Sequence, residues 1–252
     1  MNSNINIIGS IADINVIFQF LSDKSLNSSH DYLPKIRTSK SKERIINGIK
    51  SAFASYASAN HESLLVNVFE HENLNQLKSF ALFLQFNYTN KLFFLLNKNL
   101  LIKSIRNGKV NLSSKDVIAF ISSLKETEID LKGWSESTII TVARKYISFL
   151  KKLGFIKAGR KNELVYFMPT EPMLVFFIYF IKSVDIYITD LFKCEYINFI
   201  FVEKIMLIEL VKTISLKEFF NVRTNGEELF ADLKYEYSEV VDALSKRYQT
   251  EV

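Results

Sequence analysis

The sequence contains very few of the residues that end helices or cross-link a chain. It has one cysteine, three prolines and seven glycines among 252 residues. A single cysteine, Cys194, cannot form an intrachain disulfide, which is typical of a reducing compartment. Scarce turn-forming residues combined with long periodic apolar runs favour helices over a β-sandwich or barrel. Because 48% of the residues are hydrophobic, we expect a mainly α-helical, cytoplasmic protein with a substantial core.

Apolar segments long enough to cross a membrane are also missing. The stretch MLVFFIYFI (173–181) has nine residues and is followed by Lys182 and Asp185, whereas a membrane-spanning helix needs about 20. The N-terminus lacks the basic segment of a signal peptide and has Asp13 within its apolar part. We therefore expect buried helices and no membrane insertion.

The sequence shows no catalytic or cofactor-binding motif. His30, His61 and His71 are separated from one another and give no metal-ligand cluster with Cys194. Phosphate-binding and dinucleotide-binding glycine loops are absent, as is the GxSxG motif of hydrolases. Carboxylates are plentiful, but none has the spacing or the apolar setting of a general acid. We predict a protein that is not an enzyme and needs no cofactor or metal.

Apolar residues recur with helical spacing along most of the chain. Thr89 is expected to cap one helix, Gly108 to end it, and Ser113 with Asp116 to form a capping box at the start of the next. A polar loop is expected over 23–41, and Asn225-Gly226 predicts a β-hairpin. The predicted helices cover about 1–22, 41–59, 61–70, 74–87, 89–106, 113–125, 136–152, 170–184, 186–194, 197–213 and 236–248.

The segment WSESTIITVARKYISFLKKLGF, which begins at Trp134, has clear signals for where its helix starts and stops. Ser135 is a good N-cap residue, and Gly154 follows the last apolar position. Trp134 can pack on Ile139 as a hydrophobic staple, and we place it in the core. The opposite face of this helix is hydroxyl-rich and basic, and its residues are Ser137, Thr138, Thr141, Arg144, Lys145, Ser148 and Lys152.

Two short β-prone runs follow this helix, at 155–158 and 164–168, around the loop sequence GRKN. They predict a hairpin that carries Lys157, Arg160 and Lys161. Helix, helix, turn, helix and hairpin is the order of a winged helix-turn-helix. The predicted fold class is therefore mainly α, a helical bundle containing a winged helix-turn-helix, with two short β-hairpins. The predicted regions are 1–88 (N-terminal helices), 89–169 (winged helix-turn-helix) and 170–252 (C-terminal helices with a hairpin).

Charge is unevenly distributed along the chain. Between Trp134 and Pro169 there are seven Lys and Arg residues against two acidic residues, whereas residues 203–252 have seven against ten. A basic middle suggests a surface that faces a polyanion. A lysine-rich surface without a ligand would give the same composition, so both interpretations stay open.

The quoted segment resembles the W-S-x-x-T signature of the BrxA family of bacteriophage-exclusion (BREX) systems, proteins once described as inner-membrane proteins. The helix from Arg44, the apolar helix near Phe80, KLFFLLNKNLLIKSI and LSSKDVIAFI extend the resemblance, which runs more loosely to the early 240s. It implies a non-enzymatic accessory protein of phage defence, with a winged helix-turn-helix that binds DNA. It carries no catalytic residues. The family has also been likened to RNA-binding NusB-type antitermination proteins.

The leading hypothesis is duplex-DNA binding, with 136–152 as the recognition helix and 155–168 as the wing. The candidate site residues are the seven of the polar helix face together with Lys157, Arg160 and Lys161. One alternative is an adaptor that binds other proteins of the defence complex. The other is an RNA-binding protein.

Overall fold

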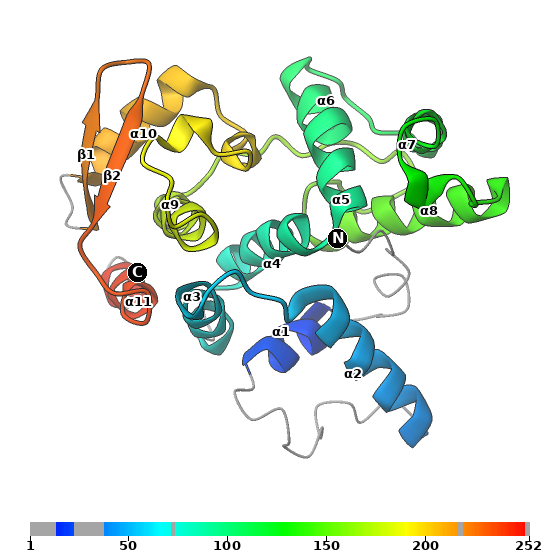
Figure 1. The fold of residues 1–252 in the computed structure, drawn as a ribbon, viewed down its shortest axis with the longest axis horizontal. Helices are drawn as coiled ribbons and strands as arrows, with labels where there is room; N and C mark the ends of the chain where they lie inside the picture. The colour runs from blue at the N-terminus through cyan, green and yellow to red at the C-terminus, as the bar shows by residue number, and fades with distance from the viewer. Residues whose placement is uncertain (1–13, 23–37, 72–73, 216–218, 250–252) are drawn as a thin grey trace. The chain divides into compact units, whose positions relative to one another are not determined.

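The computed structural model describes residues 14–22, 38–71, 74–215 and 219–249. They are mainly helical, with one two-stranded antiparallel hairpin (Figure 1). The first eight helical elements are α1 (Ile14–Ser22), α2 (Ser39–Phe53), α3 (Ala59–Glu70), α4 (Asn75–Thr89), α5 (Lys91–Leu96), η1 (Asn97–Leu101), α6 (Ile102–Arg106) and α7 (Ser114–Leu124). They are followed by η2 (Ile129–Leu131), α8 (Glu136–Lys152), α9 (Glu171–Val184), η3 (Leu191–Lys193), η4 (Ile197–Ile200), α10 (Lys204–Ser215), β1 (Phe220–Thr224), β2 (Leu229–Leu233) and α11 (Val240–Gln249).

The predicted mainly α fold is confirmed. Of the predicted N-terminal helix, residues 1–13 lie outside the described residues. So does the predicted loop over 23–41, except for its last four residues, where Ser39 begins α2.

The chain forms two compact units, and each unit combines separated stretches of sequence. Of the described residues, 14–20, 38–55 and 82–167 belong to the first unit, and 21–22, 56–71, 74–81, 168–215 and 219–249 belong to the second. The three consecutive regions expected from the sequence divide the chain along its length instead, and they remain a prediction.

Aromatic rings hold the first unit together around Phe86 of α4. The Phe86 ring lies 5.1 Å from that of Phe53 in α2, 4.5 Å from that of Phe93 in α5, and 5.6 Å from that of Phe149 in α8. All four side chains are fully buried. Such ring pairs contribute about 0.5–1.5 kcal/mol each beyond the apolar area that they bury. Phe86 therefore joins four helices of this unit.

A buried chain of hydrogen bonds links α8 to α4. The Tyr146 hydroxyl donates to Asn97 Oδ1 over 2.9 Å, and Asn97 Nδ2 donates to Asn87 Oδ1 over 2.9 Å. Asn87 Nδ2 in turn donates to the Phe83 carbonyl over 2.8 Å. Burial raises the pKa of Tyr146 well above its usual value, so the phenol stays protonated and remains a donor. Each link satisfies a polar group that is hidden from water.

The predicted helix over 89–106 is present but is not regular. It begins as α5, widens into the π-helical turn η1 at Asn97 and continues as α6. The predicted cap was wrong by one residue. Asn90 caps α5, because its Oδ1 accepts from Phe93 N over 2.8 Å, whereas the Thr89 hydroxyl donates to the Ala52 carbonyl over 2.5 Å. The predicted capping box at the start of α7 is confirmed.

The second unit is built around α9. Every residue from Met173 to Ile181 is buried, which explains the apolar run in the sequence. Among the described helices, none is both long and apolar enough to cross a membrane.

The predicted hairpin at Asn225-Gly226 is confirmed. Strand β1 pairs with β2 in the register Phe220–Leu233 to Thr224–Leu229. The four-residue turn is held by Asn225 Oδ1, which accepts from Glu227 N over 3.0 Å and from Glu228 N over 2.8 Å. Gly226 has a φ of 92°, a conformation that glycine adopts without strain.

Candidate nucleic-acid interface

Helix α8 begins and ends where the sequence predicts. Ser135 Oγ accepts from Thr138 N over 3.2 Å at the start of the helix. At its end, Phe155 N donates to the Leu150 carbonyl over 2.9 Å, and Gly154 has a φ of 85°. This hydrogen bond and left-handed glycine are the Schellman arrangement that closes a helix.

One side of α8 packs into the first unit. Its buried residues are Ile139, Val142, Ala143, Tyr146, Ile147, Phe149 and Leu150. The prediction that Trp134 belongs to the core was wrong, because its side chain is only partly buried. Trp134 lies outside the helix, in the turn after η2, and its carbonyl accepts from Lys125 Nζ over 2.7 Å.

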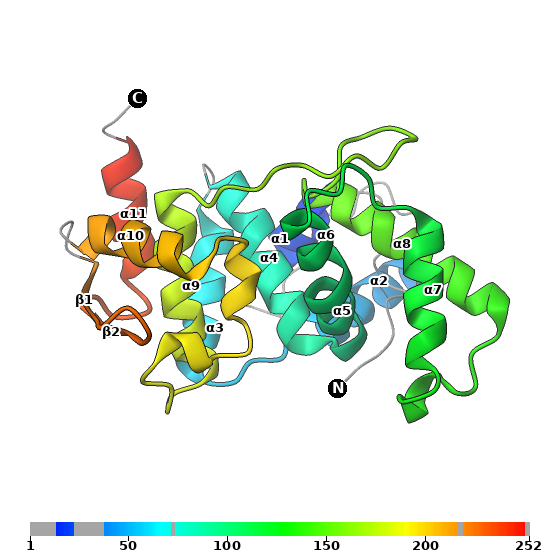
Figure 2. The ribbon, with the colours of Figure 1, turned by 90° about the horizontal axis from the view of Figure 1, so that it is seen from above.

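The opposite side of α8 faces solvent and carries the predicted site residues. Ser137, Thr141, Arg144 and Ser148 are exposed, and Thr138, Lys145 and Lys152 are partly exposed. We call this face, which the described protein covers only in part, the α8 strip. Helix α7 packs against α8 (Figures 1 and 2), and Ser137, Thr141, Arg144 and Ser148 remain exposed.

The hydroxyl groups at the start of the α8 strip already have partners within the helix. Ser135 Oγ lies 2.9 Å from both Ser137 Oγ and Thr138 Oγ1. The Thr141 hydroxyl donates to the Ser137 carbonyl over 2.8 Å. These bonds belong to the helix start. Among the cations of the α8 strip, Arg144 forms no ion pair within the described part of the chain and is therefore available to a ligand.

The segment after α8 turns back on itself, although it contains no regular strand. Lys157 N donates to the Glu163 carbonyl over 2.8 Å, and Val165 N donates to the Phe155 carbonyl over 2.9 Å. A single bridge joins Ile156 to Leu164. The second hairpin predicted from the sequence is therefore shorter than expected, with one bridge instead of two strands.

A third segment, which the sequence reading missed, completes this small β arrangement. Leu164 N donates to the Val110 carbonyl over 2.8 Å, Leu112 N donates to the Asn162 carbonyl over 3.1 Å, and Asn111 bridges to Glu163. Val110 is exposed and Leu112 is buried. This alternation between Gly108 and Ser113 is the signal that could have identified the segment.

The loop at 157–163 is attached to the end of α8. Lys151 Nζ donates to the Gly159 carbonyl over 2.6 Å, and the loop rises to one side of α8 and turns back (Figure 2). Lys157 pairs with Glu163 over 3.2 Å. Arg160 and Lys161 are exposed and form no ion pair with any described residue. The structure thus places the three loop cations next to the C-terminal end of the α8 strip.

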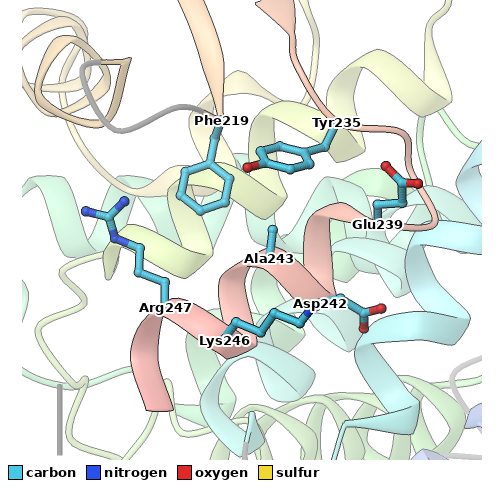
Figure 3. A pocket seen from close by; sticks show the side chains of 7 residues that line it. All are labelled: Phe219, Tyr235, Glu239, Asp242, Ala243, Lys246 and Arg247. Carbon is cyan, nitrogen blue, oxygen red and sulfur yellow. The ribbon is translucent and has the colours of Figure 1, made fainter. Parts of the chain in front are cut away.

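The second unit has a pocket between its hairpin and α11. It measures about 730 Å³, and the Phe219 and Tyr235 rings, 5.8 Å apart, lie above Ala243 of α11 (Figure 3). Two of its four charged lining residues, Asp242 and Arg247, have side-chain partners that fix them. Asp242 pairs with His71 over 2.7 Å, and the guanidinium of Arg247 lies 6.0 Å from the Phe219 ring. The lining combines two carboxylates with two cations, so the pocket lacks the excess of positive charge that a polyanion requires.

Helix α8 and the loop that follows it both lie within the residues that match a known protein family. A family model described as BrxA matches residues 33–178, which is more than half of the chain. No curated protein and no solved structure matches. The looser resemblance to the early 240s lies beyond the matched residues.

Proposed function

The chain belongs to the BrxA family and is therefore a component of a BREX bacteriophage-defence system, and we propose that it is a duplex-DNA-binding protein without catalytic activity. In this proposal α7 and α8 form a helix-turn-helix, α8 is the recognition helix, and residues 155–168 are the wing. The packing of α7 on α8 and the bridges among 110–112, 155–157 and 163–165 support this assignment. A winged helix-turn-helix combines these same parts.

The observation that carries the proposal is the set of exposed cations that the described protein does not neutralise. Arg144 lies on the α8 strip, and Arg160 and Lys161 lie on the attached loop. In the proposed complex the Arg144 guanidinium reaches a guanine edge in the major groove or a nearby phosphate. Arg160 and Lys161 contact the phosphate backbone beside it, and the remaining members of the strip surround these contacts.

A salt series of DNA-binding titrations tests this function. The variant Arg144→Ala/Arg160→Ala/Lys161→Ala removes the three cations together. Since each phosphate contact contributes roughly 0.9 to the slope of log affinity against log salt, we expect the slope to fall by about 2.7 if all three cations contact phosphate. Lys212→Ala/Lys234→Ala, in the second unit, is a charge-removal control that should keep the wild-type slope.

The two alternative functions give different results in the same assay. An adaptor protein would not shift duplex DNA at low salt, and an RNA-binding protein would release duplex DNA to structured RNA in competition. Binding of duplex DNA that the triple variant retains in full would contradict α8 and its loop as the interface.

A further inference from the structure

Helix α2 of the first unit has two halves that differ in burial. Ile49, Ala52 and Phe53, near its C-terminal end, are buried, whereas no residue between Ser39 and Gly48 is buried. Only the last turns of α2 therefore contribute to the core. The first turns project from it as a regular helix, and the Thr38 side chain caps them by accepting from Ser41 N over 3.3 Å.

The buried end of α2 is held firmly in the same core as α8. Gln85 Nε2 donates to the Phe53 carbonyl over 2.6 Å, and the Phe53 ring contacts Phe86, which contacts Phe149 of α8. Two helices that share these contacts keep a fixed position relative to each other. The projecting part of α2 is therefore a stable surface of the unit that carries α8.

The exposed face of that projecting helix is basic. Its residues recur at helical spacing and are Lys40, Glu43, Arg44, Asn47, Lys50 and Ser51, all of them exposed. Three are cations and one is an acid. Within the described residues, Lys40, Arg44 and Lys50 form no ion pair.

The arrangement of these charges is unfavourable for the isolated protein. Lys40 and Arg44 are four residues apart, so two like charges are neighbours on one helix face, which costs a few tenths of a kcal/mol, and Glu43, three residues from Lys40, offsets part of this cost. Lys40 and Lys42 lie in the first turn, which contains no acidic residue, although cations oppose the positive end of the helix dipole. A row of phosphates along this face would reverse both effects.

We propose that the α2 face, formed by Lys40, Arg44 and Lys50, is a second contact for the phosphate backbone of duplex DNA. This inference rests on the proposed function, because the duplex is the one that α8 and its loop engage. The α2 face lies within the residues matched by the family model. Its lysine and arginine side chains bind phosphates without reading sequence. The DNA site is thus longer than the segment that α8 and its loop cover.

The test measures the slope of log affinity against log salt concentration on two DNA duplexes, one of about one helical turn and one of about three. On the long duplex, Lys40→Ala/Arg44→Ala should lower the slope by about 1.8, since two phosphate contacts of roughly 0.9 each are lost. On the short duplex, centred on the α8 contact, the variant should match the wild-type protein. Lys40→Arg/Arg44→Lys keeps both charges and should keep the long-duplex slope, and Lys212→Ala/Lys234→Ala is the matched control for lost charge.

Each outcome decides between the two proposals. If the α2 double variant keeps the wild-type slope on the long duplex while the Arg144/Arg160/Lys161 variant loses slope, the α2 contact is refuted and the α8 interface stands. If the charge-retaining variant loses as much slope as the alanine variant, the α2 contact does not depend on charge and the inference fails. If the wild-type protein binds neither duplex, both proposals fail. Thermal unfolding of the α2 variants at a temperature no lower than that of the wild-type protein confirms that any loss of slope comes from the surface, since Phe53 and its contacts are untouched.

Discussion

Helices α8 and α9 contain 17 and 14 residues, yet they have different roles. Helix α9 is buried from Met173 to Ile181, on every side, and holds the second unit together. Helix α8 buries one side only and leaves the α8 strip open to solvent. Both helices contribute to a core, but of the two only the amphipathic α8 leaves a polar face exposed. In this sequence a continuous apolar run therefore indicates a buried structural helix, and a one-sided apolar pattern indicates a candidate site.

The largest expected effect is on the buried helix. Phe177→Ala removes a fully buried ring that lies 6.3 Å from the ring of Phe80. We expect the free energy of unfolding to fall by about 3–5 kcal/mol, because a cavity replaces the ring. Urea denaturation followed by circular dichroism measures the loss. On the α8 strip, Ser148→Ala should change stability by less than about 0.5 kcal/mol. Equal losses in the two variants would mean that the helices do not differ in this way.

A smaller loss is expected from the buried side of α8. Tyr146→Phe removes only the hydroxyl that donates to Asn97 Oδ1. The buried amide oxygen then lacks this donor, so unfolding should become easier by about 1–3 kcal/mol. The same urea measurement applies, and Tyr166→Phe is the matched control, since Tyr166 is 80% exposed. A Tyr146→Phe variant as stable as this control would show that the polar chain does not stabilise the unit.

The smallest expected effect on stability comes from the residues that precede the first turns of α8 and α9. Ser135 caps α8 through its side chain, whereas Thr170 at the start of α9 makes no side-chain cap hydrogen bond. Ser135→Ala should therefore lower the free energy of unfolding by about 1 kcal/mol. Thr170→Ala should lower the free energy of unfolding by clearly less. Thermal unfolding of the two variants side by side measures the difference, and the reverse order would contradict the assignment of the caps.

The features that the sequence predicted correctly depend on neighbouring residues. Ser135 and Gly154 mark the ends of α8, and Asn225-Gly226 marks the hairpin, because caps and turns need only a few adjacent residues. The exposure of Arg144 followed from the same local periodicity.

The features that were missed depend on contacts between distant parts of the chain. Thr89 and Asn90 are both good caps, and the contact of Thr89 with Ala52, 37 residues away, decides between them. The third β segment at Val110 is defined by its pairing with Leu164. The π-helical turn at Asn97 accompanies a hydrogen bond from Tyr146, 49 residues away. Local periodicity contains no information about such partners, which also explains why the discontinuous units could not be foreseen.

The hydrogen-bonded chain from Tyr146 through Asn97 to Asn87 has a consequence for how the α8 strip can evolve. Together with the buried side of α8 it holds the helix in one rotation about its own axis, and none of these contacts involves the outward side chains. Substitutions along the outer face can then accumulate, or be introduced by design, without turning the helix. A lineage under pressure from changing phages could exchange those side chains one at a time on an unchanged scaffold.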